Sequence, residues 1–309
     1  MHPAYSVILF TTASGAGYGL LALLGLVGLN HGPASTMAFA LATMAIALAL
    51  ITIGLLSSTF HLGHPERAWR ALSQWRSSWL SREGVAAIAT YPCALAFAAV
   101  WSGLVRAPQW IVPLGILTAI MCAVCVFCTA KIYSTLKTIR AWNQPLTVPV
   151  YLAFALATGA ALLAAIAAIF GRFQTFQVIF TILALLLVAI LKFLYWRRLD
   201  NASKTHTIEA ATGLGRIGAV SQWELPHTAE NFIQKEMGYA VARKHAEKLR
   251  RFVLFLLALA ILAMLASLSA PMLAIAAAVL SLSAAAVERW LFFAEAQHVV
   301  SLYYGATVN

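Results

Sequence analysis

The residue types that move protons gather in one stretch of this chain. His61, His64 and Glu66 stand within six positions, and Arg82 and Glu83 follow after one further segment. A hydroquinone loses two protons with its two electrons, so its hydroxyl groups need acceptors with pKa values of about 4 to 7 within hydrogen-bonding reach. This pattern favours quinone chemistry, with the imidazole and carboxylate groups of this set as proton acceptors and Arg82 adjusting the charge of Glu83.

Simpler interpretations exist for the same residues. Glu83 at the start of an apolar helix would compensate the helix dipole, and Ser81 before it is a suitable N-cap. Glu66 would form an ion pair with Arg70, four residues further along a helix. These structural roles are compatible with proton transfer, so the residues alone leave both interpretations open.

A second set of small residues lies in the first apolar segment. Ser14, Gly15, Gly17 and Gly19 occur at the close spacing that lets membrane helices approach each other. We expect tight helix packing here. The alternative is that Ser14, Gly15 and Gly17 form the flat wall of a pocket for a planar ligand.

Other redox groups are not expected in this chain. Cys122, Cys125 and Cys128 suggest an iron–sulfur cluster by their spacing. Within an apolar helix, however, positions three residues apart rotate by about 60° at each step, so the three sulfurs cannot converge. None of the eight histidines is central in an apolar segment, whereas transmembrane haem needs paired histidines at membrane depth. We expect no haem, no cluster and no metal.

The composition identifies the elements that must position these residues. The 309 residues are 62% hydrophobic and only 10% charged, with a mean hydropathy of +0.84. Soluble domains are nearer half apolar and a quarter charged, so an ordinary soluble protein is excluded. The net charge of +11 comes from bases scattered between apolar runs, which is typical of a membrane protein and does not indicate a nucleic-acid partner.

Runs without charged residues predict the number of membrane spans. A helix needs about 20 residues to cross the hydrocarbon core. The runs, divided at the turn formers 30–33 and at Pro271, predict an all-α integral membrane protein with one membrane domain over 1–309. The eight expected spans are 4–29, 35–60, 83–105, 110–137, 146–169, 174–196, 252–270 and 272–294.

Lysine and arginine are distributed unequally between the connections. The segments after the second, fourth and sixth spans, together with the adjoining ends of the fourth and sixth spans, hold 18 of the 21 bases, whereas Arg106 and Arg172 lie on the opposite side. By the positive-inside rule, we expect both termini and the long connections to be cytoplasmic.

Two segments do not cross the membrane. Residues 61–82 predict an amphipathic helix in the interface, with tryptophans on one face and contact with membrane lipid. Residues 197–251 form an extended polar loop that is suited to docking a partner. The polar residues expected to make this docking surface are Arg67, Arg216, Glu224, His227, Glu236 and Arg243.

Several stretches resemble the membrane anchor subunit of the dimethyl sulfoxide reductase type. They occur in the same order along the whole chain. They are His2-Pro3-Ala4 with TTASGAGYGL (11–20), STFHLGHPERAWRAL (58–72), SWLSRE (78–83), PHTAENFIQKEMGYAVARKHAEKLR (226–250) and ERWLFFAEAQHVVSLYYG (288–305).

This resemblance implies a quinone-reactive anchor in the bacterial inner membrane, using menaquinone or ubiquinone. The family attaches to a four-cluster iron–sulfur subunit and a molybdopterin catalytic subunit, so this chain would host the quinone site and not the molybdenum centre. The family's quinol-linked histidine and glutamate map onto His61 and Glu83, while the role of His64 stays open. The same anchor type serves quinone-linked sulfite dehydrogenases. The alternatives are a structural anchor without a quinone site and a small-solute or ion transporter.

Overall fold

The computed structural model describes residues 3–31, 36–201, 207–221, 223–224 and 241–304. In this part of the chain, eight helices are long and apolar enough to cross a membrane, which confirms the predicted all-α membrane bundle. They are α1 (Tyr5–His31), α2 (Met37–Ser57), α3 (Trp79–Trp101), α4 (Ile111–Ser134), α5 (Thr147–Ile169), α6 (Thr175–Asp200), α9 (Val241–Ala266) and α10 (Leu273–Ala294).

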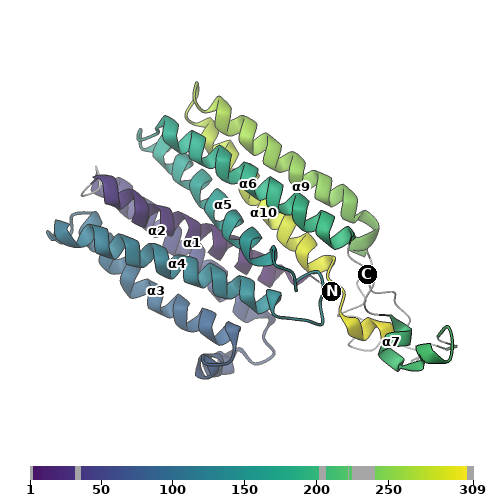
Figure 1. Ribbon diagram of the computed structural model, residues 1–309. Coiled ribbons are helices and arrows are strands. Elements are labelled where there is room, and N and C mark those ends of the chain that lie inside the picture. The colour runs from purple at the N-terminus through teal and green to yellow at the C-terminus, as the bar shows by residue number, and fades with distance from the viewer. Residues whose placement is uncertain (1–2, 32–35, 202–206, 222, 225–240, 305–309) are drawn as a thin grey trace.

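The bundle consists of two groups of four helices (Figure 1). Helices α1 to α4 form one group, and α5, α6, α9 and α10 form the other. Helices α1 and α5 are the most buried, and they join the two groups by packing against each other. Gly19 of α1 and Gly159 of α5 allow this close approach, since a Cβ on either residue would overlap the backbone of the opposing helix.

Several helices extend beyond the spans expected from the sequence. Helix α3 begins at Trp79 rather than 83, α6 continues to Asp200, and α9 begins at Val241 rather than 252. Charge-free runs mark only the part of a helix that lies in hydrocarbon. Charged residues remain good helix formers where the helix leaves the membrane.

The described parts of the connections that carry most of the bases lie at one end of the bundle, together with the start of α1 and the end of α10 (Figure 1). One of them contains two 3₁₀ turns, η1 (Ser58–His61) and η2 (Pro65–Gln74). The amphipathic helix expected over 61–82 is thus shorter than predicted, since its described helical part is the 3₁₀ segment Pro65–Gln74. Leu62 adopts an extended conformation after η1, and the amide groups of Ser77 and Ser78 both donate to the Gln74 carbonyl, which ends the η2 segment before α3 begins.

The same end of the bundle carries a projecting region formed by α7 (Ile208–Thr212), η4 (Leu214–Arg216) and the C-terminal η5 (Val299–Tyr304). The Tyr303 hydroxyl donates to the Ala211 carbonyl at 3.3 Å, which ties the two parts of this region together. Val299 donates its amide to Thr138 at 3.1 Å, so the C-terminal segment also contacts the connection between α4 and α5.

Candidate functional site

Glu83 is a buried carboxylate between α3 and α4. Because α3 begins at Trp79, Glu83 lies in the second turn of the helix, and only 6% of the residue is exposed. The Thr129 hydroxyl of α4 donates a hydrogen bond to this carboxylate. Ser81 is buried inside α3, whereas the N-cap position is occupied by Ser78, so the expectation that Ser81 caps the helix is wrong.

Arg82 fastens the preceding loop to α3. Its guanidinium donates to the carbonyl oxygens of Trp75 at 3.0 Å and Arg76 at 2.7 Å, and it lies 4.3 Å from the centre of the Trp79 ring. All of these contacts are directed at the loop and at Trp79. Arg82 therefore fixes the segment that leads into Glu83.

The two histidines of the loop are placed differently. His64 is exposed, and its Nδ1 lies 3.0 Å from a Glu66 carboxylate oxygen. Arg67 is the other partner of Glu66, at 3.6 Å, so the expected pair between Glu66 and Arg70 is not formed. His61 is the last residue of η1, and its side chain lies outside the described part of the structure.

The small residues of α1 face two directions. Ser14 and Gly15 line a cavity inside the bundle. Gly17 instead faces α2, where a Cβ would meet the backbone of Ala47 and Ile51 at 2.8 to 2.9 Å. The structure thus brings Ser14 and Gly15 to a shared cavity wall, while Gly17 serves the contact between α1 and α2.

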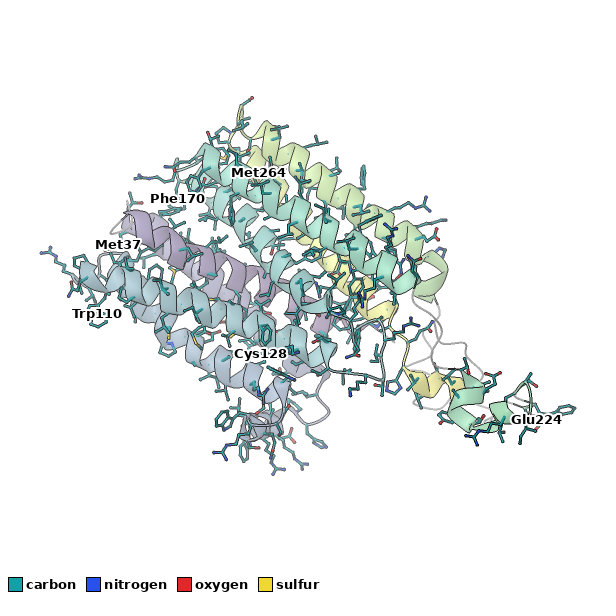
Figure 2. All side chains as sticks on the ribbon, in the orientation of Figure 1. Met37, Trp110, Cys128, Phe170, Glu224 and Met264 are labelled. Atoms are coloured by element: carbon teal, nitrogen blue, oxygen red, sulfur yellow. The ribbon has the colours of Figure 1, made fainter. Side chains whose placement is uncertain are left out.

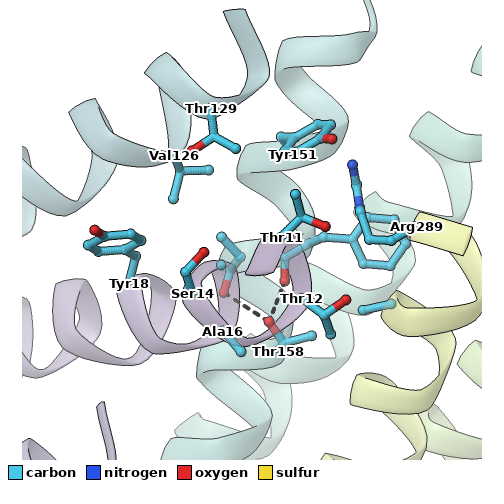
Figure 3. A pocket seen from close by; sticks show the side chains of 14 residues that line it. Thr11, Thr12, Ser14, Ala16, Tyr18, Val126, Thr129, Tyr151, Thr158 and Arg289 are labelled. Carbon is cyan, nitrogen blue, oxygen red and sulfur yellow. Dashed lines mark hydrogen bonds between the residues drawn. The ribbon is translucent and has the colours of Figure 1, made fainter. Parts of the chain in front are cut away.

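This cavity has a volume of about 20 Å³ and lies between α1, α4, α5 and α10 (Figure 3). Thr129, which donates to Glu83, also lines it. Its wall therefore includes residues from both groups of helices. The other lining residues are Thr11, Thr12, Ala16, Tyr18, Val126, Tyr151, Phe154, Ala155, Thr158, Ala285 and Arg289.

Arg289 belongs to a buried cluster of charges that fall within the predicted spans 174–196 and 272–294. Glu288 lies between two cations, with Lys192 Nζ at 2.7 Å and Arg289 Nε at 2.9 Å. All three side chains are buried, and the Arg289 guanidinium stacks 3.6 Å from the centre of the Tyr151 ring. Charged residues within predicted spans were the available signal, because such residues in membrane helices usually have a function.

A second charged contact lies beside this cluster, at the ends of α6 and α10. Arg250 of α9 lies 2.9 Å from Glu295 and 2.7 Å from Asp200, so it connects the ends of α6, α9 and α10. Burial raises the pKa of Glu295, and the neighbouring Arg250 opposes this shift. The arrangement holds the three helix ends together where they leave the bundle.

The expected docking residues are only partly described. Arg67, Arg216 and Glu224 are exposed at the end of the bundle that carries most of the bases, and Glu224 lies far from the membrane helices (Figure 2). Trp223 beside it is 96% exposed, which is unusual for a large aromatic side chain outside the membrane. His227, Glu236 and the side chain of Arg243 lie outside the described residues.

These features define a multi-pass membrane protein with a polar face at one end and buried ionisable groups beneath it. A family model described as the DMSO reductase anchor subunit (DmsC) matches residues 1–305, so the chain belongs to this family. A sulfite dehydrogenase subunit from Allochromatium vinosum is 33% identical to this chain over 331 residues, which cover 98% of this chain and 99% of the relative. The chain is an anchor subunit of a complex of the DMSO reductase or sulfite dehydrogenase type.

Anchor subunits of the DMSO reductase type assemble with catalytic and electron-transfer subunits. The multi-pass architecture is consistent with a bacterial inner membrane.

Proposed function

We propose that this anchor exchanges electrons and protons with a membrane quinone, next to the buried Glu83. A quinol that is oxidised here releases two electrons to the partner subunit and two protons to acceptors in the anchor. Glu83 and His61 are the two acceptors, and quinone reduction would run the same transfers in reverse. Arg82 supports Glu83 by holding the loop, while Ser14 and Gly15 provide part of the pocket wall.

The placement of Glu83 is the observation that carries this proposal. The carboxylate is buried, it accepts a hydrogen bond from Thr129, and it forms no ion pair within the described residues. A carboxylate without a counter-cation can take up or release a proton without breaking an ion pair. It also lies close to the polar end of the bundle, where a quinone ring can approach the partner while its isoprenoid tail stays in lipid.

The partner at this end is proposed to be an iron–sulfur subunit with four clusters, which connects the anchor to a molybdopterin catalytic subunit. The loop with Arg67 and the projecting region with Arg216 and Glu224 form the described part of its docking surface. Exposed Trp223 and Ile217 beside these polar groups fit a protein interface, because aromatic and apolar side chains are enriched in interface centres. We further propose that this face is cytoplasmic, since it carries most of the bases.

The test uses the assembled complex in membranes. Glu83→Gln and His61→Ala should lower quinone-linked turnover by roughly 10²-fold, the range typical of losing a positioned acid or base. Activity of the catalytic subunit with a soluble dye should remain, because the dye bypasses the anchor. Glu66→Gln is the matched control, since it makes the same chemical change on an exposed carboxylate.

If Glu83→Gln and His61→Ala both retain wild-type quinone-linked rates in assembled complex, this site is not where quinone reacts. Retained turnover in all such variants, together with failure to bind any quinol analogue, would leave a purely structural anchor. Reporter fusions at Ala107 and Glu209 test the sidedness separately. They should report opposite sides of the membrane, with Glu209 cytoplasmic.

A further inference from the structure

The cavity beside Glu83 contains polar groups that lack a well-aligned hydrogen-bond partner. Within the described residues, Arg289 Nη1 and Nη2 and the hydroxyl groups of Tyr151, Tyr18 and Thr12 form no well-aligned hydrogen bond, although Arg289 and Tyr151 interact with each other and Tyr18 interacts with Cys125. All four residues line the cavity, and Figure 3 shows Arg289 beside Tyr151 at its edge. Arg289 is only 2% exposed, so bulk water does not satisfy its guanidinium. Buried polar groups without partners are costly, which indicates that a ligand atom completes this site.

The unpartnered groups are mainly hydrogen-bond donors. Other hydroxyl groups on the wall already donate a hydrogen bond. Thr11, Ser14 and Thr158 donate to carbonyl oxygens of their own helices at 2.6 to 2.9 Å. Arg289 has no acceptor atom at all. The free capacity at Arg289 and Tyr151 therefore matches a ligand atom that accepts hydrogen bonds.

The pairing within the neighbouring charge cluster points the same way. Together with Arg250, the two cations Lys192 and Arg289 balance three carboxylates, so the cluster as a whole is neutral, and Glu288 is the described ion-pair partner of Arg289, through Nε alone. A charged guanidinium buried in a membrane protein is costly unless its remaining donors meet acceptors. Because Arg289 lines the cavity, an acceptor there that gains negative charge would be stabilised.

The size of the cavity limits what can enter. About 20 Å³ is enough for one water-sized group, because a site needs about 10 to 15 Å³ to hold one water. A complete quinone ring does not fit in the enclosed part, but a single ring oxygen does. Gly15 also lines this cavity, and a Cβ added there would meet no atom within 4 Å.

We propose that Arg289 and Tyr151 form the second oxygen-binding pole of the quinone site, opposite the pole at Glu83. Thr129 connects the two, since it donates to Glu83 and lines the cavity. One ligand oxygen is held near Glu83, and the other accepts hydrogen bonds from Arg289 and Tyr151. This inference rests on the proposed quinone function and adds the residues that hold the second oxygen.

Binding of a quinol analogue tests this pole without relying on turnover. The probe is a fluorescent alkyl-hydroxyquinoline N-oxide, titrated into membranes that contain the assembled complex at a measured concentration. Tyr151→Phe removes only a hydroxyl without a well-aligned partner and should weaken binding about 3- to 10-fold. Arg289→Lys, which loses the planar pair of donors, should weaken binding about 10-fold or more. Thr118→Val is the matched control, because its buried hydroxyl also lacks a described partner but lies outside the cavity.

The outcomes separate this inference from the proposed function. If Glu83→Gln weakens probe binding while Tyr151→Phe and Arg289→Lys do not, the second pole is refuted and the quinone function stands. If the wild-type complex does not bind the probe and Glu83→Gln keeps full turnover, both fail. If Arg289→Lys does not accumulate in membranes, the test is the comparison of probe binding between Tyr151→Phe and Thr118→Val. Equal binding by these two variants would refute the second pole.

A small anion presents the same acceptor chemistry as a quinone oxygen, so a second arm replaces chloride by gluconate. If this exchange lowers the thermal stability of the wild-type complex but not of Arg289→Lys, and Tyr151→Phe binds the probe normally, the cavity is a halide site and the proposal is overturned. Equal stability in both salts, with weakened probe binding by Tyr151→Phe, supports the quinone oxygen.

Discussion

Two buried carboxylates in this bundle have very different surroundings. Glu83 accepts a hydrogen bond from the Thr129 hydroxyl and has no cation in contact among the described residues. Glu288 lies between Lys192 and Arg289, at 2.7 and 2.9 Å. Both lie toward the same end of the bundle, one between α3 and α4 and the other between α6 and α10.

The difference indicates which carboxylate can change its protonation state. Glu288 contacts two adjacent cations, so neutralising it would break two buried ion pairs at once. Glu83 has no such restraint, since its only described partner is a neutral hydroxyl. Glu288 is thus suited to a fixed role in structure and electrostatics, whereas Glu83 is suited to proton transfer.

The largest expected effect comes from neutralising Glu288. Glu288→Gln leaves Lys192 and Arg289 buried without their anion, and breaking a buried ion pair in this way costs about 3 to 5 kcal/mol. We expect severe loss of the anchor from membranes, measured by quantitative immunoblotting. Glu83→Gln, the same change at the other carboxylate, should accumulate normally because no buried cation loses its partner.

A charge-preserving double variant strengthens this test. Lys192→Met combined with Glu288→Gln removes one charge of each sign, so the cluster keeps its net charge, and accumulation should recover in part. Wild-type accumulation of Glu288→Gln alone would show that this cluster does not stabilise the contact between α6 and α10.

The sequence predicts the membrane architecture well, because charge-free runs report hydrocarbon length directly. All eight spans are present, and the base-rich connections lie at one end. Helix boundaries are less predictable, since α3 and α9 begin with residues that tolerate water. The loop over 61–82 also differs, because local backbone hydrogen bonds divide it into short 3₁₀ turns.

The candidate site is only partly predictable. Glu83 is marked by its chemistry, but Thr129 is 46 residues away, and only the packing of α3 on α4 brings them together. Lys192 and Arg289 are visible as charges near helix ends, where the sequence suggests exposure to the interface. Their burial depends on how α6 and α10 pack together with α5 and α9. The residues next to Lys192 and Arg289 in the sequence do not reveal this packing. For the same reason, Gly15 and Gly17 look equivalent in sequence but face different neighbours.

The next largest effect is expected from weakening the contact between α1 and α5, which joins the two groups of helices. Gly19 lies where α1 crosses α5, and these helices connect the group that contains Glu83 to the group that contains Glu288. Gly19→Val places a branched side chain against the Ala155 backbone and should destabilise the bundle by about 1 to 3 kcal/mol or more. A lower midpoint of thermal aggregation in detergent is the expected measurement.

Gly15→Ala is the control for this effect, since a Cβ there meets no atom within 4 Å. It should aggregate at the wild-type temperature. Equal midpoints for Gly19→Val and Gly15→Ala would mean that the helices separate more easily than the close crossing implies.

A smaller effect is expected from removing the hydroxyl partner of Glu83. Thr129→Val preserves the shape of the side chain but leaves the buried carboxylate without its donor, and a hydrogen bond to a charged group contributes about 1.5 to 3 kcal/mol. Quinone-linked turnover should fall about 10-fold, with dye-linked activity unchanged. Thr129→Ser, which keeps the hydroxyl, should retain most of the rate. If Thr129→Val and Thr129→Ser behave alike, this hydrogen bond does not support the function of Glu83.

The smallest effect should come from His64, which lies outside both buried regions. Its side chain is 67% exposed, and its pairing with Glu66 is an exposed contact of the kind that contributes about 0 to 1 kcal/mol. His64→Ala should therefore change quinone-linked turnover by less than about twofold, in contrast to the loss expected for His61→Ala in the same loop. Both rates are measured on the same membranes and normalised to dye-linked activity, which corrects for differences in assembly. A tenfold loss in His64→Ala would extend the proton-transfer site to the exposed His64.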